Sequence, residues 1–473
     1  MADSAHPGAS DPVADAFTAW SHSLRWEDLP PGTRAMAKFE LLDYFGALIA
    51  GRALMGMPPW IREIAERGGR ADAHIVGGSA VPAPGAALAN GYFGHVLEYD
   101  DTHDEAVLHA GAATIPAALA CAGMRRIADT KTFLEAVVLG IEMTCRLGVA
   151  TRLNLVEGGW IYTALLGQFG ASAAAVRLLT HDSVVFRHAL GIAYCLASGN
   201  HQSTREGATT KHVQPGYAAH NGVTAALMAA NGLDGVAAPF LGEDGLVRAY
   251  LRGRFEPARA IGALGTRFEL ERLSFKPYPT CRLTHPAVSA ALNLRRELGA
   301  RVREIDVVQV RIAPQAYDVV GRPEDTRRYP IAKVHAQFSV YWAVAVVLVH
   351  GELTPAHLFS EIPVSPAVRA MIERIRCESD SAAGMRDVGG CTLRATGAFG
   401  ERAVTVDCAK GHPDDPFTED EIAAKFAANA RIARWSDKEA AQFASYVLTL
   451  DEQSDLKPLF AQLARPPGDR IEN

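Results

Sequence analysis

The sequence predicts a mainly α-helical protein: a large all-helical domain built from both chain ends, with a smaller α+β domain inserted between them. Three observations predict this fold class. Segments rich in alanine and leucine with helical spacing fill roughly the first 270 residues. β-Branched, partly alternating segments follow only after Phe268, and a helical pattern returns after Pro416. We therefore expect residues 1–268 and 410–473 to form the helical domain and residues 269–409 the inserted domain.

Short glycine or proline punctuations divide the first part of the chain into separate helices. The apolar spacing predicts helices over residues 35–50, 85–97, 114–126, 132–150, 167–179, 184–196 and 218–231. Several of them carry small residues on successive turns, as between Gly85 and Asn90. Because small residues let helices approach closely, we expect a compact helical core.

The inserted domain is expected to combine strands with two helices. The β-branched patterns predict strands at residues 305–312, 391–398 and 403–409. Gly400 and Glu401 lie between the last two strands and suit a short hairpin connection. The helices are expected at residues 336–350 and 366–376.

The helical pattern after Pro416 opens with a clear start signal. Thr418 is a suitable N-cap, and acidic residues 419–421 suit the first turn of a helix. Two or three helices are then expected to run to Leu463.

Composition and charge exclude several classes of protein. Hydrophobic residues make up 48% of the 473 residues and charged residues 21%, which is typical of globular chains rather than disordered or fibrous ones. The formal net charge is −6 and no long basic run occurs, so we expect no nucleic-acid partner. The longest apolar runs, 112–124 and 340–349, are shorter than a membrane span. Without a signal-peptide pattern at the N-terminus, a cytoplasmic location is expected.

The cysteine pattern and the known cofactor motifs indicate neither a metal nor an organic cofactor. The seven cysteines are scattered without a CxxC pair, which favours reduced thiols over a zinc site. The sequence contains no HExxH spacing and no glycine-rich phosphate loop after a strand. We therefore expect no metal site and no nucleotide cofactor.

The densest polar cluster runs from Glu98 to Glu105 and is followed by His109. It stands between two apolar helices and includes Asp101, Thr102 and His103. Carboxylates, a hydroxyl and imidazoles at one helix junction suit acid–base chemistry. A capped, solvent-exposed loop is the alternative interpretation.

A second polar segment, residues 199–212, ends in Lys211 and His212 ahead of an apolar helix. A lysine near a helix start can hold an anionic ligand such as a carboxylate. The alternative is a long surface loop.

A third segment, residues 276–286, lies at the expected domain boundary. Its prolines keep the backbone extended, and it carries Lys276, Arg282 and His285. Clefts between domains are common ligand sites, although a stiff linker is the alternative. Cys281 lies among these residues and could be a nucleophile, but a structural cysteine is the simpler interpretation.

Together these segments resemble the MmgE/PrpD family, which includes 2-methylcitrate dehydratase and cis-aconitate decarboxylase. The resemblance rests on residues 41–51 (LLDYFGALIAG), 89–91 (ANG), 100–103 (DDTH), the Lys211 segment, 278–285 (YPTCRLTH) and 336–339 (AQFS). It implies a helical domain from both termini, an α+β lid domain and a homodimer. It also implies an active site between the domains that needs no metal or organic cofactor.

The resemblance assigns roles to individual residues. The family's acid ahead of the DDT box falls on Glu98, and the box itself supplies Asp101 and Thr102. The family histidine after the box matches His109 with one extra residue of spacing, which leaves His103 as a competitor. The remaining family positions match Lys211, followed here by His212, and His285, with Tyr329 or Tyr317 for a lid tyrosine.

One position departs from the family pattern. Many members carry a Gly-aromatic-His-Pro-Thr motif, and this chain has Ile161 where the histidine stands. Isoleucine cannot exchange protons or bind a carboxylate, which suggests a different substrate. The family also includes an epimerase that acts on an amino-dicarboxylic acid.

The sequence therefore predicts a cofactor-independent lyase that moves a proton next to a carboxylate of a small di- or tricarboxylic acid. A histidine, His109 or His103, is the expected base, since histidine titrates near neutral pH. Lys211, with His285 or Arg282, is expected to stabilise the charge that develops on the carboxylate. An epimerase of a substrate such as iminodisuccinate, or a non-catalytic carboxylate-binding protein, are the alternatives.

Overall fold

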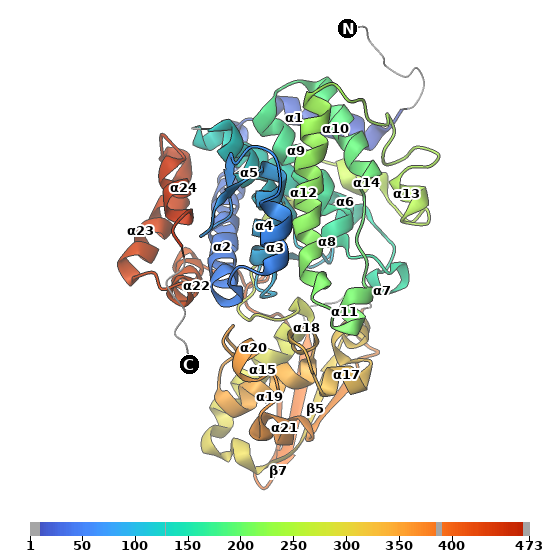
Figure 1. The fold of residues 1–473 in the computed structure, drawn as a ribbon. Helices are drawn as coiled ribbons and strands as arrows, with labels where there is room; N and C mark the ends of the chain where they lie inside the picture. Colours follow the sequence, from blue (N-terminus) through green and yellow to red (C-terminus); the bar gives the residue numbers. More distant parts are fainter. Residues whose placement is uncertain (1–9, 128, 385–389, 467–473) are drawn as a thin grey trace.

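The computed structural model describes residues 10–127, 129–384 and 390–466. Figure 1 shows a larger helical part, coloured blue to green, with the red C-terminal helices packed beside it. The smaller part, yellow and orange, lies below and contains the main sheet. This arrangement confirms the expected mainly helical fold with an α+β insertion between two helical stretches of the chain.

The larger part begins with helices from the N-terminal half of the chain. Its α-helices are α1 (Pro12–Ser23), α2 (Pro31–Met55), α3 (Pro59–Ala65), α4 (Ala83–His95), α5 (Gly111–Arg125), α6 (Thr130–Ala150), α7 (Leu155–Gly158), α8 (Tyr162–Leu165), α9 (Gly167–Leu179), α10 (Ser183–Cys195), α11 (Gln202–Glu206), α12 (Thr210–Ala230), α13 (Leu246–Ala249) and α14 (Pro257–Ile261). The C-terminal helices are α22 (Glu419–Ile432), α23 (Asp437–Leu448) and α24 (Lys457–Leu463). Short strands β1 (Ala73–His74), β2 (Ala80–Val81), β3 (Thr102–His103) and β4 (Leu273–Ser274) complete this part.

The smaller part combines helices with a four-stranded sheet. Its helices are α15 (His285–Leu298), α16 (Pro314–Ala316), α17 (Glu324–Arg328), α18 (Lys333–Gln337), α19 (Val340–His350), α20 (His357–Ser360) and α21 (Pro366–Ile372), with a π-helical turn at Tyr317–Gly321. Its strands are β5 (Ile305–Ile312), β6 (Ile375–Ser379), β7 (Cys391–Gly397) and β8 (Gly400–Val406).

The sheet has the strand order β6-β5-β7-β8. β5 pairs in parallel with β6 and antiparallel with β7, which in turn pairs antiparallel with β8. Buried and exposed residues alternate along most of β5 and β7, because helices cover one face only. α15 packs on β7 and β8, and α19 contacts β6, so the apolar core of this part lies between these helices and the sheet.

Close helix packing brings the site residues of the larger part together. α12 packs against α4 and α9, while α2 packs against the C-terminal helix α22. At Gly216 on α12, an added Cβ would lie 2.4 Å from the Leu88 carbonyl oxygen of α4. The absence of a side chain at Gly216 therefore lets α12 lie directly against α4, as the small-residue pattern predicts.

A small sheet joins the polar cluster to the start of the inserted segment. β3 pairs antiparallel with β4, with Thr102 opposite Ser274 and His103 opposite Leu273. The third polar segment therefore lies beside the first, although about 170 residues separate them along the chain.

Most expected elements are confirmed, and the strand expected at residues 305–312 coincides with β5. α12 begins at Thr210, earlier than the expected residue 218, so Lys211 and His212 lie on the helix rather than in a loop. Burial of α12 against α4 and α9 outweighs the helix-breaking tendency of Pro215 and Gly216.

Two details of the inserted domain differ from expectation. The helix expected over 366–376 ends at Ile372, and β6 follows it, since long-range pairing with β5 selects a strand there. The hairpin turn consists of residues 398 and 399, with Gly397 paired to Gly400, so Gly400 and Glu401 belong to β8 rather than to the turn. The N-cap at Thr418 and the acidic first turn are confirmed, and Glu421 completes a capping box with Thr418.

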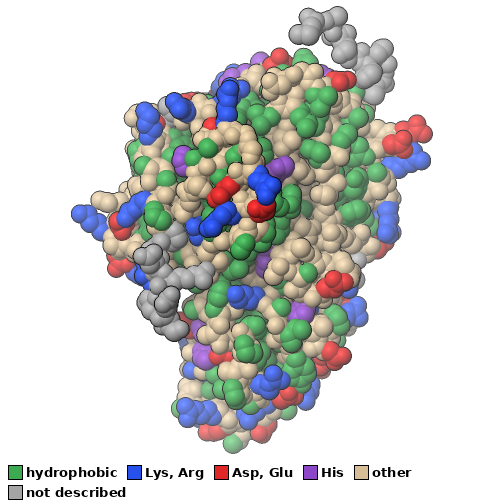
Figure 2. Space-filling model, viewed as in Figure 1, with side chains coloured by type: hydrophobic (Ala, Val, Ile, Leu, Met, Phe, Trp, Pro, Cys, Tyr) green, Lys and Arg blue, Asp and Glu red, His purple; other side chains and the backbone are tan. Residues whose placement is uncertain are grey.

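The described helices include none that is long and apolar enough to cross a membrane. Figure 2 shows lysine and arginine side chains interspersed with acidic ones over both parts of the visible face.

Candidate functional site

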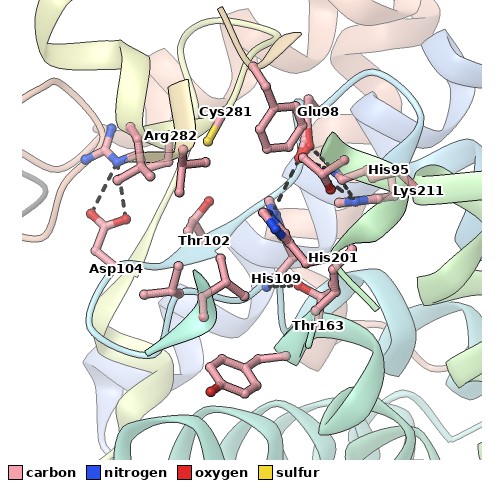
Figure 3. A pocket seen from close by; sticks show the side chains of 18 residues that line it. His95, Glu98, Thr102, Asp104, His109, Thr163, His201, Lys211, Cys281 and Arg282 are labelled. Atoms are coloured by element: carbon pink, nitrogen blue, oxygen red, sulfur yellow. Dashed lines mark hydrogen bonds and ion pairs between the residues drawn. The ribbon is translucent and has the colours of Figure 1, made fainter. Parts of the chain in front are cut away.

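A cavity lies where α4, the loop after it, the start of α12 and the segment after β4 converge. Figure 3 shows the side chains that line it. The lining residues are His95, Glu98, Thr102, Asp104, Val107, His109, Leu155, Ile161, Tyr162, Thr163, His201, Thr204, Lys211, Cys281, Arg282, Leu283, Val319 and Phe338. The three polar segments identified in the sequence therefore contribute to one cavity.

The shortest ion pair between residues that line the cavity joins Lys211 and Glu98. Lys211 Nζ lies 2.5 Å from Glu98 Oε1 and also contacts Oε2, and both side chains are at least 96% buried. Lys211 stands on the first turn of α12, while Glu98 follows α4 with a φ of 54°. This left-handed backbone conformation is uncommon for glutamate, and such strain is concentrated at functional sites.

The pKa of Glu98 is set by opposing effects. Burial alone would raise it, but the positive charges of Lys211 and Lys276 hold the pKa of Glu98 well below its usual range. Lys276 Nζ donates a hydrogen bond to the Glu98 carbonyl oxygen at 3.1 Å and lies 3.8 Å from Oε1. Burial lowers the pKa of Lys211, whereas Glu98 opposes that shift. Glu98 is therefore an anion held between two lysines.

His95 extends this ion pair into a chain of hydrogen bonds. Its Nδ1 lies 2.7 Å from Asp100 Oδ2 and its Nε2 lies 2.7 Å from Lys211 Nζ. Because the lysine ammonium only donates, His95 Nε2 accepts, and Nδ1 carries the proton that bonds Asp100. His95 therefore holds Lys211 in place and orients it toward the cavity.

His109 has one ring nitrogen free to act as a base. Its Nδ1 lies 2.6 Å from the Asp101 carbonyl oxygen, which can only accept a hydrogen bond, so Nδ1 carries the proton. Nε2 is then unprotonated and lies 3.6 Å from Glu98 Oε1. Burial lowers the pKa of His109 to about 3, so the imidazole is neutral at neutral pH. Thr163 fixes the residue further by accepting from the His109 main-chain N–H at 3.1 Å.

Asp101 shapes the start of α5. Its carboxyl oxygens accept hydrogen bonds from the main-chain N–H groups of Ala110 at 2.8 Å and Gly111 at 3.2 Å. Burial, followed by the charge of Asp100, raises the pKa of Asp101 to about 8. The Asp101 carboxyl does not line the cavity, so this residue positions His109 through its carbonyl and through the helix that it caps.

A second buried carboxyl, Glu40 on α2, lies beside Asp101. A Cβ on Gly111 would lie 2.0 Å from Glu40 Oε1 and 3.2 Å from Asp101 Oδ1, so both carboxyls meet the same glycine at the start of α5. Burial and the neighbouring Asp101 raise the pKa of Glu40 well above its usual range. Both effects favour the protonated form of Glu40.

Arg282 and Asp104 form a separate pair on the other side of the view in Figure 3. Arg282 Nε lies 3.2 Å from Asp104 Oδ2, and the guanidinium also donates to the carbonyl oxygens of Ala409 and Lys410. Cys281 lines the cavity next to Arg282, and burial raises the pKa of its thiol to about 11. Cys281 is thus a neutral thiol at physiological pH, which disfavours a thiolate nucleophile.

His212 is buried beside the site and supports its wall. Gln337 donates its amide N–H to the Val96 carbonyl oxygen at 3.0 Å, so its amide oxygen faces His212 Nε2 at 2.9 Å. The imidazole therefore donates to Gln337 and is neutral. Burial, followed by the charge of Lys211, lowers the pKa of His212 to about 3.

Three of the expected site residues lie away from the cavity. His103 is buried and pairs with Glu269, 3.2 Å from Nε2 to Oε2, so its ring is engaged outside the cavity. His285 is fully buried, and its Nε2 lies 3.1 Å from the Thr280 carbonyl oxygen. Tyr329 is 37% exposed and donates to Glu373 at 2.8 Å on the surface of the smaller part.

Tyr317 also stays outside the cavity, because it lies in the π-helical turn and its ring faces Arg322. Lys276 and His212 do not line the cavity themselves. Lys276 contacts Glu98, which lines the cavity, and His212 bonds Gln337 in the surrounding wall. Ile161, at the position where the resemblance implies a histidine, lines the cavity.

Several cavity residues were not singled out from the sequence. His95 stands at the end of an apolar helix, one turn before the polar cluster, and that proximity is the only signal that points to it. Thr163, Thr204 and Phe338 lie in segments that the sequence singled out but were not distinguished within them, because their position at the cavity depends on helix packing. His201 belongs to the second polar segment but was not distinguished within it.

One group of side chains has the spacing of a metal site. His95, Asp100 and His109 offer ligand atoms that all lie within 4.8 Å of one another. However, Lys211 Nζ already lies 2.7 Å from His95 Nε2, and Lys276 is a second nearby cation. Their charges disfavour a further cation here, so the geometry suits a chain of proton donors and acceptors better.

The arrangement supplies what proton transfer next to a carboxylate requires. A neutral imidazole faces the cavity, and a buried ammonium lies beside it to stabilise an anion. Apolar side chains including Leu155, Ile161 and Leu283 complete the wall, which strengthens the electrostatic interactions inside.

Comparisons with known proteins match the chain to the domains of one family and to several enzymes with the same name. A model of the MmgE/PrpD N-terminal domain matches residues 15–258, and a model of the MmgE/PrpD C-terminal domain matches residues 278–452. A cis-aconitate decarboxylase-like protein of Aspergillus oryzae is 26% identical, over 94% of this chain and 96% of that protein. A cis-aconitate decarboxylase of Aspergillus terreus is 28% identical over 76% of each chain. The human cis-aconitate decarboxylase is 24% identical, over 97% of this chain and 96% of that protein.

Proposed function

The chain belongs to the MmgE/PrpD family, and we propose that it is a lyase that acts on a small di- or tricarboxylic acid without a cofactor. The observation that supports this most strongly is the free Nε2 of the neutral His109 beside the buried Lys211. The reaction is dehydration or decarboxylation, and both require charge stabilisation at a carbon next to a carboxylate.

In dehydration, His109 Nε2 takes the proton from the carbon next to the substrate carboxylate. The electron pair moves onto that carboxylate, where the positive charge of Lys211 stabilises it. The electron pair then forms a double bond as the β-hydroxyl leaves as water with the proton that His109 had taken, which restores the neutral imidazole. His95 and Asp100 keep Lys211 oriented during these steps.

In decarboxylation, the bond to the departing carboxylate breaks and the electron pair remains on the substrate carbon. Lys211 stabilises that charge through the retained carboxylate, and the carbon then takes up a proton that the neutral His109 relays from solvent through Nε2. The names of the relatives, cis-aconitate decarboxylase, support this variant.

Ile161 supports the epimerase as a second candidate. It replaces a polar position of the family motif at the cavity wall, so the substrate contacts there differ. An epimerase uses the same first proton transfer but returns the proton to the opposite face of the carbon. A protein that only binds carboxylates would share the cavity and catalyse none of these steps.

A substrate panel in deuterated water separates these functions. We expect NMR of the purified protein with di- and tricarboxylic acids, including cis-aconitate and 2-methylcitrate, to show a new double bond or released carbon dioxide. Deuterium exchange at the α-carbon without either product would indicate an epimerase. Binding without any turnover across the panel would overturn the enzyme proposal. Lys211→Met is the control, because it removes the cation while keeping most of the side-chain volume.

A further inference from the structure

Buried polar atoms without partners gather beside the cavity near α11 and α17. His201 and Thr204 line the cavity, and α18 contacts both α11 and α17. Within the described ranges, no hydrogen bond reaches His201 Nδ1, Thr204 Oγ1 or two guanidinium nitrogens of Arg327, Nε and Nη1. All three residues are at most 5% exposed. Because buried polar groups are normally hydrogen-bonded, their clustering indicates a place for a polar ligand.

Arg327 differs from the other cations of the site. Lys211 and Lys276 both lie against Glu98, and Arg282 pairs with Asp104. Arg327 has no ion pair with any acid in the described part of the chain. A buried guanidinium without an anion is costly, so its position is best explained by an anion that arrives with the ligand.

The position of Arg327 connects it to the cavity wall. Its guanidinium carbon lies 5.9 Å from the centre of the Phe338 ring, and Lys211 Nζ lies 5.0 Å from the same ring. Phe338 lines the cavity, so the two cations stand near one wall residue. Burial lowers the pKa of Arg327 to about 10, which leaves it positively charged at neutral pH.

His201 supplies an imidazole next to the position where Ile161 replaces the family histidine. The His201 main-chain N–H donates to the Gly159 carbonyl oxygen at 2.9 Å, which fixes it against the segment that carries Ile161. Burial, followed by the charges of Arg205 and Arg327, lowers the pKa of His201 to about 4. His201 is therefore a neutral hydrogen-bonding group at the cavity.

We propose that His201, Thr204 and Arg327 form a second anion subsite that holds a carboxylate remote from the reacting carbon. His201 and Thr204 donate hydrogen bonds to this carboxylate, and Arg327 supplies the positive charge. The substrate is then at least a dicarboxylate, with its reacting end at Lys211 and His109. This inference rests on the proposed function for the assignment of the reacting end, but the subsite itself is a binding property.

Calorimetric titration with succinate and with butyrate tests the subsite without requiring turnover. We expect the wild type to bind succinate more tightly than butyrate. Arg327→Met should weaken succinate binding by about 10- to 100-fold, since hydrogen bonds to charged groups contribute about 1.5–3 kcal/mol, and leave butyrate binding nearly unchanged. Arg327→Lys should retain most of the succinate affinity. Arg205→Met is the matched control, because Arg205 is an exposed arginine close to His201.

The outcomes separate the subsite from the lyase proposal. A folded Arg327→Met variant whose affinity for succinate stays within twofold of the wild-type affinity would overturn the subsite. This holds even if the enzyme turns over a dicarboxylate. Arg327-dependent succinate binding without turnover on any acid would support the subsite and overturn the lyase. If Arg327→Met fails to fold, His201→Phe decides, because loss of its ring nitrogens should also weaken succinate selectively. Failure of the wild type to bind succinate more tightly than butyrate would overturn the subsite directly.

Discussion

The charges at the cavity are set by burial and by a few close partners. Glu98 stays anionic despite complete burial, because two lysines lie against it. His109 stays neutral, because burial disfavours its charged form and its Nδ1 proton is used by the Asp101 carbonyl. A neutral base and a cation therefore both lie against Glu98 at neutral pH.

The first prediction concerns the identity of the base. His109→Gln should lower kcat by about 10²–10⁴-fold and change substrate binding far less, because it removes the imidazole that moves the proton. His103→Gln is the matched control, since His103 is engaged by Glu269 outside the cavity. Steady-state kinetics of both folded variants provide the measurement. If His103→Gln lost turnover while His109→Gln kept it, the assignment of the base would be reversed.

The second prediction concerns metals. Because Lys211 and Lys276 place positive charge next to His95, Asp100 and His109, a divalent cation should bind there weakly. We expect exhaustive dialysis against EDTA to leave the turnover rate within twofold of the untreated protein. A larger loss that Zn²⁺, Mg²⁺ or Mn²⁺ restores would show that this triad is a metal centre.

At the scale of the elements, the site depends on how closely α12 approaches α4. The Lys211 ammonium on α12 meets His95 at the end of α4 and Glu98 just after it. Gly216 lies about one and a half turns further along α12, where the backbones of the two helices are in contact. Helix separation at Gly216 would therefore move Lys211 relative to both partners.

The third prediction tests this helix contact. Gly216→Ala places a Cβ 2.4 Å from the Leu88 carbonyl oxygen, so the helices must move apart. We expect a loss of about 1–3 kcal/mol in unfolding free energy and a clear drop in kcat, measured by urea unfolding and by steady-state kinetics. Ala230→Val adds volume at an exposed position of the same helix and should leave both quantities nearly unchanged. Equal behaviour of the two variants would contradict the proposed role of the contact.

At the scale of the whole molecule, the cavity joins segments from distant parts of the chain. Residues near 100, 160, 200 and 280 line it together with Phe338 of the smaller part. Several histidines at or near it, including His109, His201 and His212, have pKa values lowered mainly by burial. Folding of the molecule is therefore linked to the protonation of these histidines.

The fourth prediction follows from this linkage. The unfolded chain binds protons on His212 near pH 6.5, whereas the folded chain does so only near pH 3, so stability falls as pH drops through this window. His212→Gln should reduce the loss of stability between pH 7 and pH 5 by about 2 kcal/mol, measured by urea unfolding. His22→Gln, at an exposed position, is the control. The same acid-induced loss in wild type and His212→Gln would rule out this contribution.

The fifth prediction concerns assembly. Tyr217 and Met228 lie three turns apart on α12, so they share a face, and both are exposed apolar side chains that a second copy could cover. We expect light scattering at micromolar concentration to give a mass near twice the 50.6 kDa of one chain. Met228→Asp should shift this mass toward the monomer. A wild-type mass of one chain at that concentration would contradict the homodimer.

Local pattern alone determined the fold class and the segments that carry the site. Helical spacing, the strand at residues 305–312 and the cap at Thr418 depend on neighbouring residues, so they could be read directly from the chain. The polar cluster after α4 and Lys211 were also visible, because chemistry-bearing residues stand out against apolar helices.

Tertiary packing decided which of these side chains meet. The sequence matched His109 to the family histidine and left His103 as a competitor. In the folded chain, β3 pairs with β4 and His103 contacts Glu269, while His109 faces the cavity. β6 and the early start of α12 likewise depend on long-range contacts that outweigh local preference. Arg327 lies nearly 130 residues from His201 along the chain, so only the folded molecule shows that an unpaired guanidinium stands beside the cavity. Side-chain contacts between distant segments leave no local trace in the sequence, because burial and charge pairing arise only once the helices pack.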